Sequence, residues 1–347
     1  MSGPAVPRNR LDARLRAEQD GRYQPGLGRL KRSLTLNDYA AQDQPRVPVH
    51  DRHRHVSSAQ DQPASAPAHL AVNDRDCTAF LQWALPRAGL LWPGFRKVRR
   101  LVCKRLGRRL TALGLADLAQ YGALLERDPA ERQAFDALCR IPISRFYRDR
   151  GVFDALREHV LPQLAGRASA RGKRVLRAWS AGCASGEEPY TLRIIWELAL
   201  KTRFPGIELQ IIATDAEPVM LERARSGCYG PGSLGDVPKD WLPLAFERKG
   251  GLACVRESFR RNIEFKLQDI RMEMPEGPFD LILCRNLVFT YFDPAAQEAL
   301  AARIMKRLRP GGVLAIGIHE KLPAALADLH PLPAAPALYG KSERIAG

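Results

Sequence analysis

The chain has 347 residues, with 54 Lys or Arg against 38 Asp or Glu and a formal net charge of +16 at pH 7. It contains no run of 18 uncharged apolar residues and no apolar stretch near its N-terminus, so we expect neither membrane insertion nor a secretory signal. The seven cysteines are scattered without metal-ligand spacing, which predicts reduced, mostly buried thiols in a cytoplasmic protein with no metal site.

Residues 1–75 are predicted to form a disordered tail. Their only aromatic residues are Tyr23 and Tyr39, and they are rich in Pro, Gln, Arg, Asp and Ala. Such a composition cannot bury enough apolar area to offset the entropy lost on ordering.

Residues 76–145 have helical periodicity and are predicted to form a small all-α domain. The clearest helix is Phe95–Leu110, whose apolar residues recur at three- and four-residue steps. Four cations spaced by four residues form a separate basic stripe: Arg96, Arg100, Lys104 and Arg108. From spacing alone, the basic stripe fits either a solvated helix face or a docking surface for an acidic partner.

The positive charge is concentrated between Cys77 and Arg150, where 15 Lys or Arg accompany 6 Asp or Glu. Such a surface favours an acidic partner, either nucleic acid or an acidic protein helix. The chain has no base-methylation motif such as Asn-Pro-Pro-Tyr, and no interleaving of aromatic and basic residues for base stacking. We therefore expect a protein partner and no nucleic acid.

Residues 146–347 alternate short apolar runs with amphipathic segments, which predicts a Rossmann-like α/β domain with a parallel, doubly wound sheet. Pro310-Gly311-Gly312 predicts a turn before the last strand. An insert at about 244–268 breaks the alternation, and its Gly-Gly turn predicts an antiparallel hairpin in a small β-subdomain. Strands are expected at 174–180, 207–214, 279–284 and 313–318, and helices at 188–201, 217–226 and 295–308.

The segment AWSAGCASGEEPY, residues 178–190, joins the first predicted strand to a helix. Gly182 and the small residues after it keep this turn narrow, which leaves room for a ligand at the carboxyl edge of the sheet. Glu187 and Glu188 then place carboxylates where a phosphate would be repelled. The turn therefore favours a ligand with cationic and hydroxyl groups, such as S-adenosylmethionine.

Asp215 ends the second predicted strand, ELQIIATD. In a nucleoside-binding α/β domain, an acid at this place accepts hydrogen bonds from ribose hydroxyls. The dinucleotide fingerprint GxGxxG does not follow the first strand, so a nicotinamide or flavin enzyme is the less favoured interpretation.

Five segments, taken together and in order, resemble the chemotaxis-receptor (CheR-type) methyltransferase family: CRIPISRFYRDRGVF, GCASGEEPY, ATDAEPVMLERARSGCY, PFDLILCRNLVFTYFD and LRPGGVLAIGIHE. The resemblance implies a class I methyltransferase sheet with a small antiparallel β-subdomain, preceded by the helical domain. It implies methyl transfer from S-adenosylmethionine to glutamate side chains of a chemoreceptor, leaving S-adenosylhomocysteine. The basic helical domain would then face an acidic cytoplasmic helix of the receptor, and we expect the protein to act as a monomer.

The same resemblance implies roles for individual residues. Arg148 and Tyr291 would align the acceptor, and Arg148 would also contact the cofactor. A glutamate acceptor is already ionised near pH 7, so the enzyme needs to desolvate and align it but needs no general base. The cofactor contacts carried over from the family motifs and the turn are Ser144, Gly182, Glu187, Glu188, Asp215, Asp269, Ile270, Arg285 and Asn286.

Two departures from the family pattern keep other functions open. Pro142 stands where relatives carry Asn, and four residues, Leu287–Thr290, precede Tyr291 where three are usual. The alternatives are a methyltransferase of the same fold that acts on another protein or a small acid, and a catalytically silent module that binds the cofactor.

Overall fold

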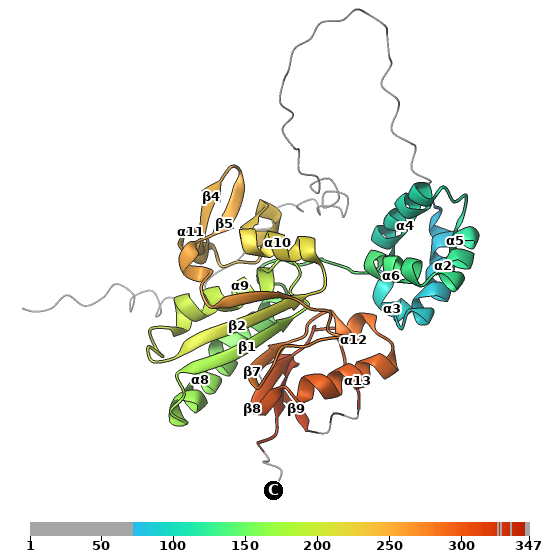
Figure 1. The fold of residues 1–347 in the computed structure, drawn as a ribbon. Helices are drawn as coiled ribbons and strands as arrows, with labels where there is room; N and C mark the ends of the chain where they lie inside the picture. The colour runs from blue at the N-terminus through green and yellow to red at the C-terminus, as the bar shows by residue number, and fades with distance from the viewer. Residues whose placement is uncertain (1–71, 325, 327, 334, 344–347) are drawn as a thin grey trace, which may run out of the picture. The chain divides into compact units, whose positions relative to one another are not determined.

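A computed structural model of the protein describes residues 72–324, 326, 328–333 and 335–343 (Figure 1). The predicted disordered tail, residues 1–75, lies outside the described residues except for its last four. Two of those four, Asp74 and Arg75, already belong to the first helix. No helix among the described residues has both the length and the apolar character needed to cross a membrane.

The N-terminal part of the described chain is helical, as predicted. Its core is aromatic, because Tyr121 and Phe135 both pack against Phe80, with ring centroids 5.8 and 6.0 Å from it. Side chains of Asn73, Asp117 and Asp128 cap three of the helices by accepting hydrogen bonds from first-turn N–H groups. The helices are α2 (Asp74–Arg87), α3 (Trp92–Phe95), α4 (Arg99–Leu113), α5 (Leu118–Arg127) and α6 (Pro129–Leu138).

The basic helix begins later than predicted. A turn separates α3 from α4, so Arg96 lies before the helix instead of in its first turn. Val98 caps α4 with non-helical backbone angles, and Gly114 ends it in the left-handed conformation. The stripe residues Arg100, Lys104 and Arg108 keep their four-residue spacing within α4.

A seven-stranded sheet in the order β6-β2-β1-β7-β8-β10-β9 forms the centre of the α/β part. The first five strands in this order pair in parallel, and β10 is antiparallel to both of its neighbours. The α/β fold class is therefore confirmed. The strands are β1 (Val175–Ala181), β2 (Glu208–Asp215), β6 (Ile263–Leu267), β7 (Phe279–Leu283), β8 (Leu308–Ala315), β9 (Leu329–Leu332) and β10 (Ala335–Lys341).

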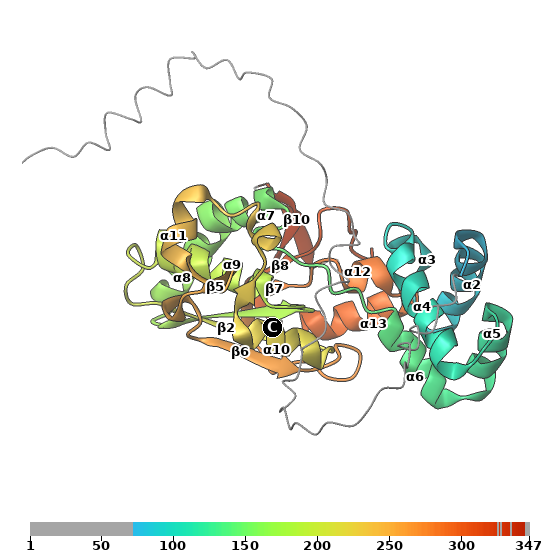
Figure 2. The same ribbon diagram turned by 90° about the horizontal axis from the view of Figure 1, so that it is seen from above.

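Helices cover both faces of this sheet, with α8 and α9 on one face and α13 on the other (Figures 1 and 2). Both faces of the central strands are therefore buried, which explains why β7 is apolar except for Asp280. The helices of this part are α7 (Arg150–Ala155), η1 (Leu156–Val160), α8 (Leu161–Ala170), α9 (Glu187–Ile195), η2 (Trp196–Leu200), α10 (Pro218–Ser226), α11 (Leu242–Ala245), α12 (Val288–Tyr291) and α13 (Pro294–Met305).

The predicted turn at Pro310-Gly311-Gly312 is wrong, because these residues lie within β8. Pairing with β7 shifts between Phe279↔Leu308 and Leu281↔Val313, so the intervening residues of β8 form a bulge. Gly311 has φ +71°, and a Cβ on Gly312 would lie 2.8 Å from a Leu308 carbon atom. The glycines thus permit a bulged strand instead of separating a helix from a strand.

The predicted hairpin is present as β4 (Phe246–Lys249) and β5 (Leu252–Val255), joined at Gly250-Gly251. A third short strand, β3 (Cys228–Tyr229), pairs with β5 to complete the β-subdomain sheet. The strand at 263–267, which the sequence grouped with this insert, instead pairs in parallel with β2 as the edge of the large sheet. This strand also contacts α10. Single 3-10 turns surround the small sheet: η3 (Pro231–Leu234), η4 (Lys239–Trp241) and η5 (Glu257–Phe259).

Four of the seven cysteines form disulfides, so the prediction that all are reduced thiols is wrong. Cys77 on α2 is bonded to Cys103 on α4, and Cys228 on β3 is bonded to Cys254 on β5. Each pair is 26 residues apart in sequence. The pairs become adjacent only through helix packing and through the β3–β5 register, neither of which is visible in cysteine spacing.

Candidate active site

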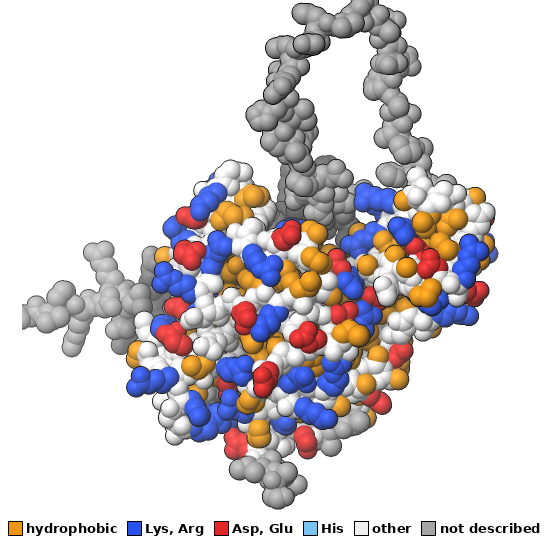
Figure 3. Space-filling view, viewed as in Figure 1, with side chains coloured by type: hydrophobic (Ala, Val, Ile, Leu, Met, Phe, Trp, Pro, Cys, Tyr) orange, Lys and Arg blue, Asp and Glu red, His pale blue; other side chains and the backbone are white. Residues whose placement is uncertain are grey.

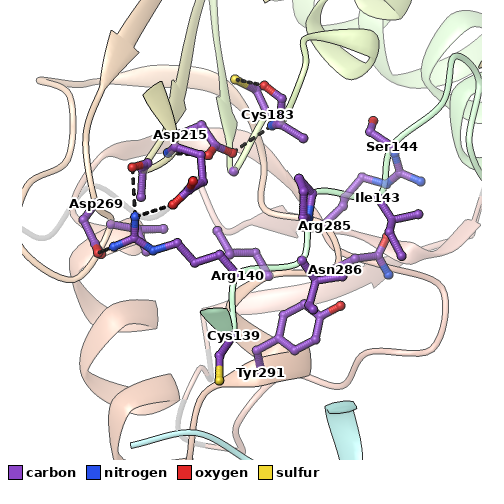
Figure 4. A pocket seen from close by; sticks show the side chains of 18 of the residues that line it. Cys139, Arg140, Ile143, Ser144, Cys183, Asp215, Asp269, Arg285, Asn286 and Tyr291 are labelled. Atoms are coloured by element: carbon purple, nitrogen blue, oxygen red, sulfur yellow. Dashed lines mark hydrogen bonds and ion pairs between the residues drawn. The ribbon is translucent and has the colours of Figure 1, made fainter. Parts of the chain in front are cut away.

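A cavity of about 190 Å³ lies at the carboxyl ends of β1, β2 and β7 (Figure 4). The chain order reverses between β1 and β7, which is the switch point where open α/β sheets bind ligands. In Figure 4, Asp215, Asp269 and Arg140 lie on one side of the cavity, and Ser144 and Asn286 lie on the other. Most of the predicted site residues line this cavity: Ser144, Arg148, Gly182, Glu188, Asp215, Asp269, Ile270, Arg285, Asn286 and Tyr291.

Backbone hydrogen bonds fix the position of the turn after β1. The N–H groups of Gly182 and Cys183 both donate to the Thr214 carbonyl, at 2.8 and 3.0 Å, which fixes the turn to the end of β2. Gly182 has φ +72°, and a Cβ there would lie 2.7 Å from a Leu287 methyl group. Gly182 is therefore required both by its conformation and by the close approach of Leu287.

Asp215 and Glu188 form the acidic wall of the cavity. The carboxylate of Asp215 accepts from the backbone N–H groups of Ala184 and Glu217, at 2.8 and 2.9 Å, one on each oxygen. Burial raises its pKa, and these two backbone hydrogen bonds oppose the rise. Glu188 accepts from Ser180 Oγ at 2.7 Å and from Arg285 at 2.9 Å. Both carboxylates are oriented before any ligand arrives, and their remaining lone pairs are available.

Glu187 does not line the cavity, although it was predicted as a cofactor contact. Its side chain is buried, 1% exposed, and accepts from Ser185 Oγ at 2.9 and 3.0 Å. Burial raises its pKa, and a hydrogen bond with Ser144 opposes that shift. Glu187 therefore stabilises the turn through Ser185 and contacts Ser144, but it does not line the cavity itself.

Asp269 belongs to an ion network that reaches the helical domain. Arg271 donates to Asp269 and, through both of its terminal nitrogens, to Asp136 of α6 at 2.6 and 2.7 Å. Arg140 pairs with Glu217 at 2.6 Å and lies 3.6 Å from Asp269. Burial would raise the pKa of Asp269, but its contacts with Arg271 and Arg140 outweigh this and lower it. The Asp269 oxygens thus already have cationic partners. Sequence reasoning missed both arginines, since nothing local marks them.

Arg285 joins two segments of the site. Its side chain is 3% exposed and pairs with Glu188 at 2.9 Å and with Asp149 at 2.8 Å. It also donates to the Arg148 carbonyl at 2.6 Å. Two half-buried carboxylates therefore satisfy its charge, and Arg285 acts as a link between the turn after β1 and the backbone of Arg148.

Arg148 lines the cavity and has no ion-pair partner among the residues the structure describes. One of its nitrogens donates to the Ile143 carbonyl at 2.7 Å. The flanking residues Tyr147 and Asp149 have φ of 57° and 60°, an unfavourable backbone that the surroundings must enforce. Arg148 is thus a half-buried cation with free donor capacity.

Tyr291 lines the cavity close enough to Arg148 to be influenced by its charge. Burial raises the pKa of its hydroxyl to about 12, although the charge of Arg148 lowers it. The phenol therefore stays protonated at neutral pH and can donate a hydrogen bond. Its ring packs on Phe95 of α3, with centroids 5.0 Å apart.

The helical domain contributes a wall of the cavity, which sequence reasoning did not predict. Leu90, Phe95 and Val98 line it. The Leu91 N–H donates to the Tyr291 carbonyl at 2.7 Å. A Cβ on Gly94 would lie 2.1 Å from the Thr290 carbonyl oxygen, so only glycine lets α3 approach α12 this closely.

The four residues of the basic stripe are all exposed. Figure 3 shows Lys and Arg side chains spread over the visible face of the protein, with Asp and Glu side chains among them. None of Arg96, Arg100, Lys104 and Arg108 has an ion-pair partner in the described part of the chain. The neighbouring cations of α4 do have partners. Arg99 pairs with Asp74 at 2.7 Å and Arg109 donates to Glu131 at 2.9 Å. The helix thus separates cations used in the fold from cations that face solvent.

The three free cysteines are packing residues. Cys139, Cys183 and Cys284 are all buried. Burial raises the pKa of each thiol, so none forms a thiolate at neutral pH. No covalent cysteine intermediate is supported.

The cavity fits S-adenosylmethionine in the chemistry of its walls. The narrow turn at Gly182 brings backbone close to the cavity, while Asp215 and Glu188 provide acceptors for hydroxyl and cationic groups. The buried side chain of Ile270 and the Pro142 ring provide apolar surface beside them. A phosphate-bearing nucleotide would meet these two carboxylates and is disfavoured.

A family model described as "CheR methyltransferase, SAM binding domain" matches residues 143–335. The chemotaxis protein methyltransferase of Salmonella typhimurium is 35% identical over 260 residues, covering 72% of this chain and 85% of that protein. The corresponding protein of Listeria monocytogenes is 37% identical over 198 residues, covering 57% and 72% of the two chains.

An uncharacterized 104.1 kDa protein of Rhodobacter capsulatus is 34% identical over 233 residues. The match covers 67% of this chain but only 24% of that protein, so this chain spans about a quarter of its length. Among solved structures, the N-methyltransferase NodS of Bradyrhizobium japonicum, in complex with S-adenosyl-L-homocysteine, is 19% identical. The match covers 50% of this chain and 62% of that one, with a TM-score of 0.26.

Proposed function

Because this chain belongs to the CheR methyltransferase family, we propose that it methylates glutamate side chains of a chemoreceptor-like protein with S-adenosylmethionine as methyl donor. The observation that carries this proposal is the set of charged side chains that line the cavity. Asp215 and Glu188 provide carboxylates, and Arg148 provides a guanidinium that has no carboxylate partner among the described residues. The carboxylates suit a cationic, hydroxyl-bearing cofactor, and the guanidinium of Arg148 suits an acceptor carboxylate.

S-adenosylmethionine, when bound, supplies a methyl group on a positively charged sulfur, which departs as a neutral thioether. The acceptor carboxylate is ionised at neutral pH, so it attacks without a general base. Arg148 can orient that carboxylate through its guanidinium, and the protonated Tyr291 hydroxyl can donate to it. Leu90, Phe95 and Val98 form an apolar wall of the cavity, and Phe95 packs on Tyr291, so this wall excludes water beside Tyr291. Alignment and desolvation are therefore the contributions of the protein.

The basic stripe supports an acidic helix as the docking partner. Arg100, Lys104 and Arg108 recur one helical turn apart along α4 and point to solvent. Acidic residues at similar spacing on a receptor helix would match them. This partner also motivates the proposed cytoplasmic location, because the receptor helices that carry methylation sites lie there.

The decisive experiment incubates the full chain with methyl-labelled S-adenosylmethionine and a receptor cytoplasmic fragment. We expect label in the fragment that mild alkali releases as methanol, since a methyl ester is base-labile. A fragment whose acceptor glutamates are changed to glutamine is the matched control and should gain no label. Alkali-stable label would contradict the glutamate acceptor. Cofactor binding without turnover on any acidic protein would instead favour the silent regulatory module.

A further inference from the structure

The loop between Asn286 and Tyr291 is one residue longer than the family pattern, and both of its ends line the cavity. The structure accommodates it with an unusual backbone. Asn286 has φ 56°, in the left-handed region, and Leu287 has φ −130° and ψ −89° before the short helix α12. A loop with such a backbone does not hold its own shape, so something outside it must fix the positions of Asn286 and Tyr291.

Glu320, which follows β8, contacts both ends of this loop. One oxygen accepts from the Asn286 backbone N–H at 3.0 Å, and the other accepts from Thr290 Oγ1 at 2.6 Å. The first oxygen also accepts from the N–H of Gly317 in its own turn, at 2.5 Å. The residue is 9% exposed, so water contributes little to its hydrogen bonding.

The approach of Glu320 depends on Gly317. A Cβ at that position would lie 2.6 Å from Asn286 Nδ2 and 2.9 Å from the Glu320 carboxylate. The turn therefore packs directly beneath the loop, with no side chain between them. On the far side, the Tyr291 backbone is held by Leu91 of the helical domain. Tyr291 is thus fixed between Leu91 on one side and Glu320, acting through Thr290, on the other.

A buried carboxylate is costly unless its oxygens are hydrogen-bonded. Among the described residues Glu320 has no salt bridge, and Arg285 influences it only through its charge. Its three donors are all protein groups, two from the loop and one from its own turn. A glutamine could accept from the Asn286 N–H through its oxygen, but its NH₂ group would donate to the Thr290 hydroxyl instead of accepting from it, and every one of these hydrogen bonds would lose the negative charge that strengthens it. Only a carboxylate can accept from both ends.

We propose that Glu320 is a positioning residue that sets Tyr291 and Asn286 against Arg148 in the active site. This inference rests on the proposed function for the role of Tyr291 in acceptor alignment. Glu320 does not line the cavity and acts through the loop alone. Glu320 thereby compensates for the extra residue before Tyr291. Without such a contact, the sequence does not determine the direction of the Tyr291 side chain.

The experiment compares Glu320→Gln, Thr290→Val, the double variant and Thr290→Ser in steady-state methyl transfer. We expect Glu320→Gln to lower kcat about 10-fold and Thr290→Val to lower it about 3-fold, with the acceptor KM nearly unchanged. The double variant should be no worse than Glu320→Gln, because both changes break the same contact. Thr290→Ser keeps the hydroxyl and should restore activity. Additive losses, or no loss in Thr290→Val, would overturn the proposal.

Asp280→Asn is the matched control. Asp280 is also a buried carboxylate, 2% exposed, and it accepts from the Arg177 N–H at 2.9 Å and pairs with Arg309 at 2.8 Å. It lies near the start of β7, at the edge of the sheet opposite the cavity. We expect this variant to lower the melting temperature as Glu320→Gln does while keeping kcat within about 2-fold. An equal loss of kcat in both variants would reduce Glu320 to a purely structural role.

A second readout separates this inference from the proposed function. The chain has eight tyrosines, so carbon-13 labelling of the tyrosine rings gives a simple NMR spectrum in which Tyr291→Phe identifies the Tyr291 signal. We expect that signal to shift in Glu320→Gln and Thr290→Val but not in Asp280→Asn. Failure of the wild type to methylate a receptor fragment would refute the proposed acceptor and leave this test intact. An unmoved Tyr291 signal would refute the inference even with the acceptor correct.

Discussion

Helix α4 and the cavity both contain paired cations beside unpaired ones, but they differ in exposure to water. On α4, Arg99 and Arg109 are paired and the basic stripe faces solvent. In the cavity, Arg285 is paired and Arg148 is half-buried without a carboxylate partner in the described residues. Exposed charges are screened beyond roughly 10 Å at 0.1 M salt, whereas buried ones are screened much less. We therefore expect the stripe to govern encounter and Arg148 to govern the chemical step.

The largest expected effect comes from Arg148→Met, which removes the unpaired charge from the cavity. We expect kcat to fall about 100-fold, as for other losses of a charged donor at the reacting group. Arg148→Lys should recover only part of this, because an ammonium lacks the planar fork. Arg150→Met is the control, since Arg150 is exposed and pairs with Asp154. A kcat loss below about 3-fold in steady-state kinetics would remove Arg148 from the chemical step.

Asp215→Ala sharpens the comparison within the cavity, because it removes one carboxylate and leaves Arg148 in place. We expect S-adenosylhomocysteine to bind about 10- to 100-fold more weakly in calorimetry, through lost hydrogen bonds to a charged group. Glu217→Ala is the control, since Glu217 also lines the cavity but is paired with Arg140. Unchanged affinity in Asp215→Ala would mean that the cofactor does not contact this carboxylate.

Reversing Arg100 and Lys104 to Glu tests the encounter role of the basic stripe. The KM for the protein acceptor should rise about 10-fold at low salt, from about 0.2–1 kcal/mol for each exposed pair lost and added repulsion. Cofactor affinity should not change, and added salt should remove the difference from the wild type. The control reverses Lys173 and Arg174, two exposed cations before β1 that alter the net charge equally. Equal KM increases in both variants would reduce the stripe to a solvated helix face.

The smallest effect concerns a paired cation in the helical domain. Hydrogen bonding from Arg109 lowers the pKa of Glu131 below its ordinary value of 4.5, with burial opposing and Tyr121 assisting. The pair therefore stabilises the fold above pH 4.5, and its contribution is lost as the pH falls through the lower, folded-state value.

Thermal melts from pH 7 to pH 3 check this prediction. Glu131→Gln should lower stability on the order of 1 kcal/mol at pH 7 and converge with the wild type in acid. Glu126→Gln is the control, because Glu126 is exposed on the neighbouring helix. A difference in stability between Glu131→Gln and the wild type that persists at pH 3 would show that the negative charge at position 131 is not what stabilises the fold.

The elements that sequence reasoning located well are those defined by local pattern. The observed bounds of β1, β2 and β7 fall within about one residue of the predicted ones, because buried parallel strands are continuous apolar runs. The start of β8 was missed because its bulge is set by pairing with β7, not by the Pro-Gly-Gly run itself. The assignment of β6 to the insert was wrong for the same reason, because pairing with β2 places this strand in the large sheet.

Within the candidate active site, the sequence identified the types of residue but not the directions in which their side chains point. Glu187 and Glu188 are adjacent in the first turn of α9 and therefore point about 100° apart, so only one can face the cavity. The network of Arg140 and Arg271 and the wall from α3 join residues far apart in the chain. Such contacts leave no signal in a single sequence, because each residue alone is an ordinary surface arginine or core apolar group.

The contact between Gly94 and the Thr290 backbone constrains how this protein can be recombined with its relatives. Any larger residue at position 94 would collide with the carbonyl oxygen, and Leu91 would lose its bond to Tyr291. A chimera that takes its helical domain from one relative and its α/β domain from another should therefore carry residues 89–98 and 286–293 from the same parent. The helical domain and the α/β domain are therefore exchangeable only together with these two contacting segments.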